Sequence, residues 1–279
     1  MTHAALASGQ VALLTGAASG IGLAAATRFA GFGMKLVIVD IDANALAKAE
    51  GELLAAGAPE VMAAVVDVAD AAAMRALANR VAQVFGPLSV LMNNAGREGG
   101  GELLGDPTRF KAILDTNLGG VVNGIQAFVP AMIEAAKPGL VINTGSKQGI
   151  TTPPGDTAYN ASKAAIKVVT EALAHDLRQH PGLPITAHLL IPGFTFTGFT
   201  RVRTDIKPDA AWLPEQVIDF MLPAIERGDF YILCPDNDVT RAMDEKRIAW
   251  AAGDLIENRP ALSRWHPDYA GAFKQFMES

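Results

Sequence analysis

The chain of 279 residues contains one cysteine, 6% aromatic residues and no excess of positive charge. With Cys234 alone, an intramolecular disulfide is impossible and a thiolate metal cluster has no basis. The 23 lysines and arginines are outnumbered by 29 acidic residues, giving a formal net charge of −6. A basic footprint for nucleic acid is therefore absent, and no Lys/Arg run suggests an anionic membrane surface.

Long apolar runs are also missing. No stretch approaches the ~20 residues that cross a bilayer. Residues 1–10 lack the positive segment and apolar run of a secretory signal, so we expect a cytoplasmic protein. The five histidines show no paired ligand spacing, so no metal site is predicted.

Short, almost continuously apolar segments alternate with amphipathic ones. The expected strands are 11–14, 35–39, 61–66, 90–92, 140–143, 185–191 and 230–233. The expected helices are 21–30, 43–56, 70–85, 108–136, 158–180 and 215–227. Strands apolar on both faces belong to parallel sheets. The alternation predicts an α/β fold, a doubly wound seven-stranded parallel sheet with helices on both faces.

One domain is expected over residues 1–279, with a cofactor-binding and catalytic core at 8–200. Residues 195–230 would form a substrate lid, and 195–214 would be an irregular flap. Residues 235–279 would form a C-terminal extension with a helix at 239–252 and an extended arm at 257–269.

A glycine-rich turn follows the first strand and precedes a helix, in the sequence Thr15-Gly16-Ala17-Ala18-Ser19-Gly20-Ile21-Gly22. Gly16 permits the tight turn, Gly20 lets a pyrophosphate approach the backbone, and Gly22 lets the helix pack close to the sheet. The free N–H groups at the helix start attract phosphates. We therefore expect a dinucleotide site that includes Ser19 and Ile21.

Two carboxylates follow the next strands. Asp40 ends the second strand, where it can accept hydrogen bonds from ribose hydroxyls and repel a 2′-phosphate. Ser19 and Ile41, the two places for a phosphate-binding base, are not basic. NAD is therefore favoured over NADP. Asp67, followed by Val68, could face the adenine amino group or cap the next helix.

Further motifs carry a family resemblance. They are Asn93-Asn94-Ala95-Gly96 after strand four, Ser146 thirteen residues before Tyr159, Tyr159-Asn160-Ala161-Ser162-Lys163, and Pro192-Gly193 with Thr197. Their order and spacing resemble the short-chain dehydrogenase/reductase family over roughly residues 8–200. The resemblance implies a Rossmann fold, a nicotinamide cofactor and alcohol–carbonyl chemistry. Beyond Thr197 it weakens.

The expected chemistry centres on Tyr159. Tyr159 and Lys163 are four residues apart on one predicted helix, so they share a face. A free phenol has a pKa near ~10, which a nearby ammonium and an oxidised nicotinamide would lower. Ser146 can bond the substrate oxygen. The resemblance implies that Asn117 forms a helix kink holding a proton-relay water near the lysine.

The remaining expected cofactor contacts come from two loops. Asn94, Ala95 and Gly96 would line the adenine ribose side, unless they form a simple turn. Pro192, Gly193 and Thr197 would close over the nicotinamide carboxamide with backbone contacts from Thr195, unless they only begin a loop.

Basic and aromatic side chains bear on the substrate. Arg97 and Lys147 could attract an acidic or polyoxygenated substrate, or could reach solvent or pair with Glu98 or Glu102. Candidates for an apolar lid are Phe194, Phe196, Phe199 and Trp212, any of which could instead be core.

The sequence thus predicts an NAD-dependent oxidoreductase acting on a secondary alcohol or ketone. An NADP-dependent carbonyl reductase and a non-catalytic dinucleotide-binding regulator are the alternatives. A serine hydrolase is excluded because Ser146 is not in a Gly-x-Ser-x-Gly elbow. The family resemblance also implies a homodimer or homotetramer formed through the helices at 108–136 and 158–180.

Overall fold

The computed structural model describes residues 3–198 and 206–279, and its centre is one sheet of seven parallel strands. The strands are β1 (Val11–Thr15), β2 (Lys35–Asp40), β3 (Val61–Val65), β4 (Val90–Asn93), β5 (Gly139–Thr144), β6 (Ile185–Ile191) and β7 (Tyr231–Leu233). Their order across the sheet is β3-β2-β1-β4-β5-β6-β7. The predicted doubly wound sheet is confirmed.

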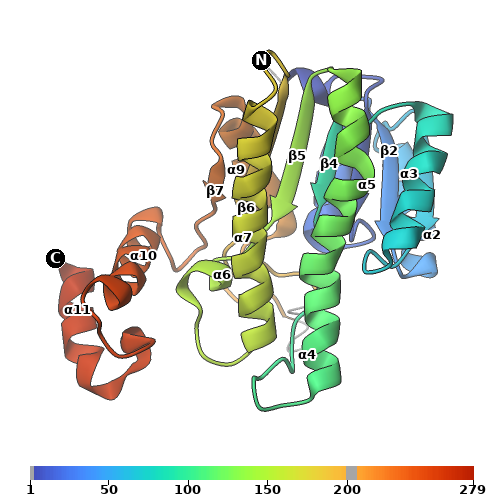
Figure 1. The fold of residues 1–279 in the computed structure, drawn as a ribbon. Coiled ribbons are helices and arrows are strands. Elements are labelled where there is room, and N and C mark those ends of the chain that lie inside the picture. The colour runs from blue at the N-terminus through green and yellow to red at the C-terminus, as the bar shows by residue number, and fades with distance from the viewer. Residues whose placement is uncertain (1–2, 199–205) are drawn as a thin grey trace.

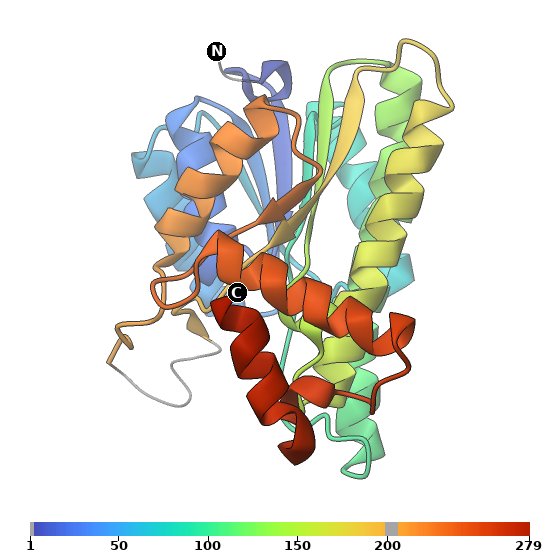
Figure 2. The same cartoon turned by 90° about the vertical axis from the view of Figure 1, so that its left-hand side faces the viewer.

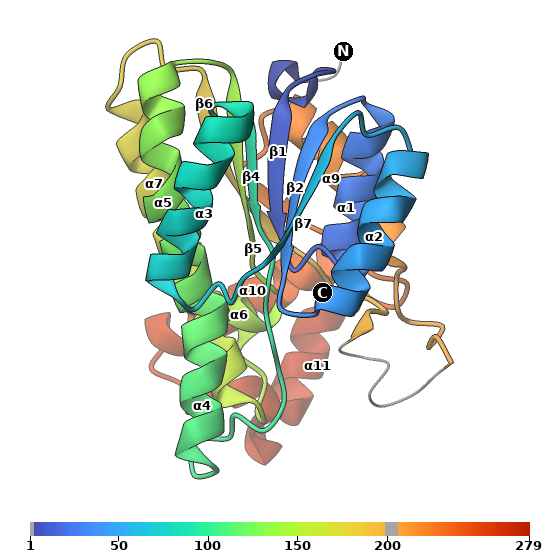
Figure 3. The same cartoon turned by 90° about the vertical axis from the view of Figure 1, so that its right-hand side faces the viewer.

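Helices cover both faces of this sheet (Figure 1). On one face lie α1 (Gly20–Gly31), α2 (Ala43–Ala55) and α9 (Pro214–Glu226). On the other lie α3 (Ala71–Phe85), α5 (Gly120–Ala135) and α7 (Thr157–Arg178), which form the left-hand layer in Figure 3 together with α4 (Pro107–Leu114). A short 3-10 helix, η1 (Ala4–Leu6), precedes β1.

The strand sequences build two cores because alternate side chains point to opposite faces. In β1, Ala12 and Leu14 pack with α1, α2 and α9, whereas Val11 and Leu13 pack with α3, α5 and α7. All four are buried, at 5% exposure or less. A strand buried on both faces therefore needs apolar residues at every position, and not an alternation of apolar and polar residues.

The helical run from Pro107 to Ala135 passes a length and composition test for a membrane span. No such run was expected from the sequence. Within the fold, its Val121, Phe128 and Met132 are buried against the sheet and its neighbours, as in a core helix.

The C-terminal extension leaves the sheet after β7. It contains α10 (Arg241–Ile256), the 3-10 helices η3 (Ser263–Trp265) and η4 (Pro267–Tyr269), and α11 (Ala270–Glu278). Figure 2 shows α10 passing below β7, toward α7, with α11 beneath it. The helix predicted at 239–252 is present, but the extended arm predicted at 257–269 is wrong. Those residues turn tightly instead, because Trp250 gathers Ser263, Phe273 and Phe276 around it.

Candidate active site

A cavity of about 950 Å³ opens at the carboxyl ends of the strands. Its position follows from topology, since the chain leaves β1 in one direction and β4 in the other, and ligands bind at such a switch point. The predicted residues on its wall are Gly16, Ser19, Gly20, Ile21, Asp40, Asp67, Val68, Asn94, Ala95, Gly96, Ser146, Tyr159, Lys163, Pro192, Gly193, Thr195 and Thr197. Gly22 and Asn117 lie behind the wall.

The glycine turn has room for backbone only. Gly16 has a φ of +62°, and a Cβ there would lie 2.8 Å from the Cα of Ala95. A Cβ on Gly22 would lie 2.2 Å from the carbonyl oxygen of Gly16. These contacts form a cradle that fits the close approach of a pyrophosphate to the start of α1.

Asn94 joins the ends of three strands. Its Nδ2 donates to the carbonyl oxygens of Thr15 (3.1 Å) and Gly16 (3.3 Å), and its Oδ1 accepts from the Thr144 hydroxyl at 3.3 Å. The Thr15 hydroxyl in turn accepts from the backbone N–H groups of Asn94 and Ala95. Asn94 thus holds the glycine turn in place in addition to lining the cavity.

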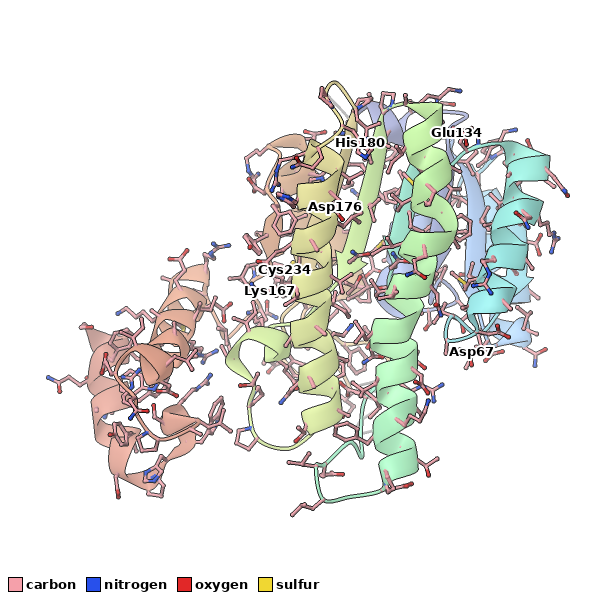
Figure 4. The ribbon with its side chains drawn as sticks, viewed as in Figure 1. Asp67, Glu134, Lys167, Asp176, His180 and Cys234 are labelled. Atoms are coloured by element: carbon pink, nitrogen blue, oxygen red, sulfur yellow. The ribbon has the colours of Figure 1, made fainter. Side chains whose placement is uncertain are left out.

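Two carboxylates line the cavity where β2 and β3 end. Asp40 accepts hydrogen bonds from the backbone N–H groups of Ala18 (3.2 Å) and Ile41 (2.8 Å). Asp67 accepts from the backbone of Ala69 at 2.9 Å and lies at the end toward which the strands run (Figure 4). The alternative of Asp67 as a helix cap is wrong, since Asp70 caps α3.

Helix α7 places Tyr159 and Lys163 on the cavity wall, beside the carboxyl end of β5. Asp156 caps this helix by accepting from the Tyr159 backbone N–H, and it also accepts from the backbone of Gly99. The Lys163 Nζ donates to the Thr144 carbonyl at 2.8 Å and lies 5.6 Å from the centre of the Tyr159 ring. Asp156 was not predicted from the sequence, although an aspartate just before a helix is a usual cap signal.

Burial perturbs both of these groups. It raises the pKa of Tyr159 to about 12; the Ser146 hydroxyl opposes this rise, and the charges of Glu98 and Asp156 add to it. Burial lowers the pKa of Lys163 to about 8, against the opposing effect of Glu98. Two groups with opposed shifts, side by side in a cleft, are typical of acid–base sites.

Asn117 lies in a π-helical turn, η2 (Asp115–Gly119), between α4 and α5. Its Oδ1 accepts from the Arg97 backbone N–H at 2.7 Å, and its Nδ2 donates to the Arg97 carbonyl at 2.9 Å and the Ser162 hydroxyl at 3.0 Å. This π-helical turn lies where the resemblance implies a helix kink. The proton-relay water stays a prediction. The side chain clamps the loop after β4 to the helix of Tyr159.

The loop after β6 folds back on itself. The backbone of Phe196 donates to the Trp212 carbonyl, and that of Trp212 donates to the Phe194 carbonyl. Phe194 is 41% exposed and lines the cavity, as a lid residue would. Phe196 is buried and Trp212 packs on Phe220, so these two are wrong as lid residues. Phe199 lies outside the described residues.

The two candidate substrate cations differ. Lys147 is paired with Asp236 and Asp244, so neither Glu98 nor Glu102 is its partner and its charge is not free for a substrate. The side chain of Arg97 lines the cavity and forms no ion pair within residues 3–198 and 206–279. In the same residues, no group of three or more His, Cys, Asp or Glu is arranged to hold a metal.

Comparison with known sequences identifies the family. The family model described as short chain dehydrogenase matches residues 10–207. The 1-deoxy-11-beta-hydroxypentalenate dehydrogenase of Streptomyces exfoliatus is 32% identical over 262 residues, covering 92% of this chain and 94% of that protein. The chain belongs to the short-chain dehydrogenase/reductase family of oxidoreductases, as the motifs predicted.

Solved structures agree. A short-chain dehydrogenase/reductase from Burkholderia phymatum in complex with NAD has a TM-score of 0.80 and 33% identity, covering 90% of this chain and 96% of that one. A metagenomic short-chain oxidoreductase in complex with NADP has a TM-score of 0.69 and 30% identity, covering 82% and 98%. The family binds nicotinamide dinucleotides, and both cofactor types occur among these neighbours.

Proposed function

We propose that this protein is an NAD-dependent dehydrogenase that interconverts a secondary alcohol and a ketone. The carrying observation is that Ser146, Tyr159 and Lys163 line one end of a cavity whose other end holds the glycine turn and Asp40. A bare dinucleotide-binding regulator would have no use for the first three residues.

Bound in this cavity, a nicotinamide dinucleotide supplies the hydride acceptor for alcohol oxidation and the hydride donor for ketone reduction. The glycine turn and the start of α1 would hold its pyrophosphate. Asp67, Val68, Asn94, Ala95 and Gly96 would line its adenosine half. Pro192, Gly193, Thr195 and Thr197 would close over its nicotinamide end.

The chain's own residues move the proton. Tyr159 would take the hydroxyl proton of the alcohol in oxidation and return it in reduction. The Ser146 hydroxyl would bond the substrate oxygen as negative charge develops there. Lys163 would favour the phenolate by its charge and hold the ribose hydroxyls. Asn117 would keep the π-helical turn and the loop after β4 in register with α7.

Asp40 carries the choice of NAD. Its carboxylate is at the cavity wall, where a 2′-phosphate would meet a like charge, and neither Ser19 nor Ile41 offsets that charge. The similar solved structures include one in complex with NAD and one in complex with NADP, so NADP-dependent ketone reduction is the alternative that the assay must distinguish. The cytoplasmic location and the homodimer or homotetramer stay predictions.

The test is a panel of secondary alcohols and ketones assayed with each cofactor by the absorbance of the reduced nicotinamide. We expect turnover with NAD, and a loss of about 10²- to 10⁴-fold in Tyr159→Phe, the usual range for a general acid–base group. Tyr231→Phe is the matched control, because that hydroxyl bonds Glu171 at the edge of the sheet. Full activity in Tyr159→Phe would overturn the mechanism, and dinucleotide binding without any turnover would favour the regulator.

A further inference from the structure

The ammonium of Lys147, the residue after Ser146, lies in a buried cluster of charges. Its Nζ is 2.6 Å from an Asp244 carboxylate oxygen and 3.2 Å from an Asp236 carboxylate oxygen. The three side chains are 15%, 6% and 6% exposed, so the ions are nearly shielded from water. Lys147 comes from the loop after β5, Asp236 from the segment after β7, and Asp244 from the first turn of α10.

Asp236 brings in a third loop. The same oxygen that meets Lys147 accepts from the backbone N–H of Phe194 at 3.3 Å. Its other oxygen accepts from the backbone of Val239 at 2.8 Å, which fixes the carboxylate. Gly193 is packed between the charges, because a Cβ there would lie 2.6 Å from Asp236 and 2.9 Å from the Lys147 Nζ. The cluster therefore joins the loops after β5, β6 and β7.

Packing within the C-terminal extension holds Asp244 in position. Thr240 caps α10, and Ile248 packs on the core cluster that holds Ile166 and Leu233. Farther along, the Trp250 ring is covered by the Arg259 guanidinium at 4.0 Å, and its Nε1 donates to the Ser263 hydroxyl. The extension is thus a small folded unit, and its Asp244 contacts Lys147 in the loop after β5.

A buried ion pair is a poor source of net stability but a strongly directional contact, since each charge must keep its partner. Of the loops joined here, one carries Ser146 and another begins with Pro192 and Gly193. In the function proposed above, on which this inference rests, these loops flank the reacting carbon from the substrate side and the nicotinamide side.

We propose that Lys147, Asp236 and Asp244 are positioning residues through which the C-terminal extension fixes the Ser146 loop against the Pro192–Gly193 loop. None of the three would touch the reacting atoms. The C-terminal extension is then part of the catalytic framework and not a peripheral addition.

The experiment compares Asp244→Asn with the matched control Glu245→Gln. Asp244→Asn leaves Lys147 and Asp236 as a balanced pair, and it removes the carboxylate charge that lies 3.9 Å from the Arg247 guanidinium. Because the Arg247 side chain is 21% exposed, solvent can partly hydrate its charge, so this variant should fold. Glu245 is the next residue of the same helix, and its carboxylate pairs with Arg241 at the surface. Lys147→Met removes the positive charge of the cluster. Lys147→Arg keeps that charge and should therefore keep the activity that Lys147→Met loses.

Two readouts are made on each variant. The first is amide hydrogen exchange of residues 146–151 and 193–196 in the cofactor-free protein. We expect exchange to be about tenfold faster or more in Asp244→Asn and Lys147→Met, and unchanged in Glu245→Gln. The second is turnover of an alcohol found in the panel. We expect kcat to fall about tenfold to a hundredfold, the cost of a small misplacement. KM and the Kd of the reduced cofactor should stay within about threefold, because binding contacts remain.

The outcomes separate the two proposals. If exchange and kcat in Asp244→Asn match Glu245→Gln, even with a lower Tm, the cluster only anchors the extension and the positioning role is wrong. If the unaltered protein oxidises no alcohol, the proposed function fails, and hydrogen exchange still decides whether the cluster fixes the two loops.

Discussion

The pH dependence of alcohol oxidation tests the coupling between Tyr159 and Lys163. Burial raises the pKa of Tyr159 to about 12 and lowers that of Lys163 to about 8. The shift of the phenol from 10 to about 12 disfavours the phenolate by ~2.7 kcal/mol. Lys163 loses its proton first, so its charge is absent at the pH where a free Tyr159 would titrate.

The size of the coupling follows from the geometry. The Lys163 Nζ lies 5.6 Å from the centre of the Tyr159 ring. With the phenolate charge placed at the ring centre and an effective dielectric constant of about 20, the attraction is ~3 kcal/mol, which lowers the phenol pKa by ~2, to about 10 while the ammonium is present. Above pH ~8 the pair holds one proton, and the phenolate–ammonium form makes up ~1% of it at any pH.

We therefore expect kcat for oxidation to rise about tenfold per pH unit up to pH ~8 and then to level off. The positive charge of the oxidised cofactor would lower the pH at which kcat levels off, but the pH profile would keep the same shape. Reduction, in which Tyr159 donates the proton, should slow as pH rises through the same region. In Lys163→Met the bend should vanish, with a loss of about 50- to 100-fold at pH 8 that shrinks as pH rises.

The assay is the initial rate between about pH 6 and 10, with a carbon-deuterated alcohol to confirm that hydride transfer limits the rate. Tyr231→Phe serves as the control for an unrelated tyrosine. A kcat that keeps rising tenfold per unit well above pH 8 in the unaltered protein would refute the coupling. So would a Lys163→Met profile that parallels the unaltered one.

Three further predictions concern binding. Asp40→Ala combined with Ile41→Arg should shift the ratio of kcat/KM values toward NADP by about a hundredfold or more, because a like charge is replaced by an opposite one; an unchanged ratio would mean that Asp40 does not face the ribose. Gly22→Ala should abolish dinucleotide binding and lower Tm, because its Cβ would lie 2.2 Å from a backbone oxygen, whereas Gly31→Ala on the same helix meets nothing within 4 Å and should do neither; calorimetry with NADH decides. Arg97→Ala should reduce turnover of an acid more than that of its ester, and equal losses would remove the guanidinium from substrate recognition.

Local sequence was sufficient for most of the sheet. Each strand from β1 to β6 is a short apolar run, and the burial of alternate residues on opposite faces requires such a run. Glycines at turns and Tyr159–Lys163 at helical spacing are also local patterns. Because the carboxyl ends of parallel strands meet at one edge, the residues of these local patterns come together in one cavity.

Short or composite elements could not be predicted in this way. Helix α6 (Gln148–Thr151) has four residues and packs its Gly149 against the backbone of Lys163, so no periodicity reveals it. The π turn at Asn117 contains Thr116, Asn117 and Gly119, which are poor helix formers, but no local pattern distinguishes a π turn from an α-helical one. In the tail, Pro260 and Pro267 suggested an extended arm, but the packing around Trp250 outweighs that local preference.

The charge cluster shows most clearly where sequence reasoning stops. Lys147 and Asp236 are 89 residues apart, and nothing in the sequence around either one identifies its partner. Read alone, a lysine directly after Ser146 suggests a cation for the substrate. In the fold, β5, β6 and β7 lie side by side in parallel, so the loops that follow them converge at one edge and neutralise that lysine with two carboxylates. A charged residue in a candidate site can therefore be assigned to substrate or to framework only after its neighbours across the strand ends are known.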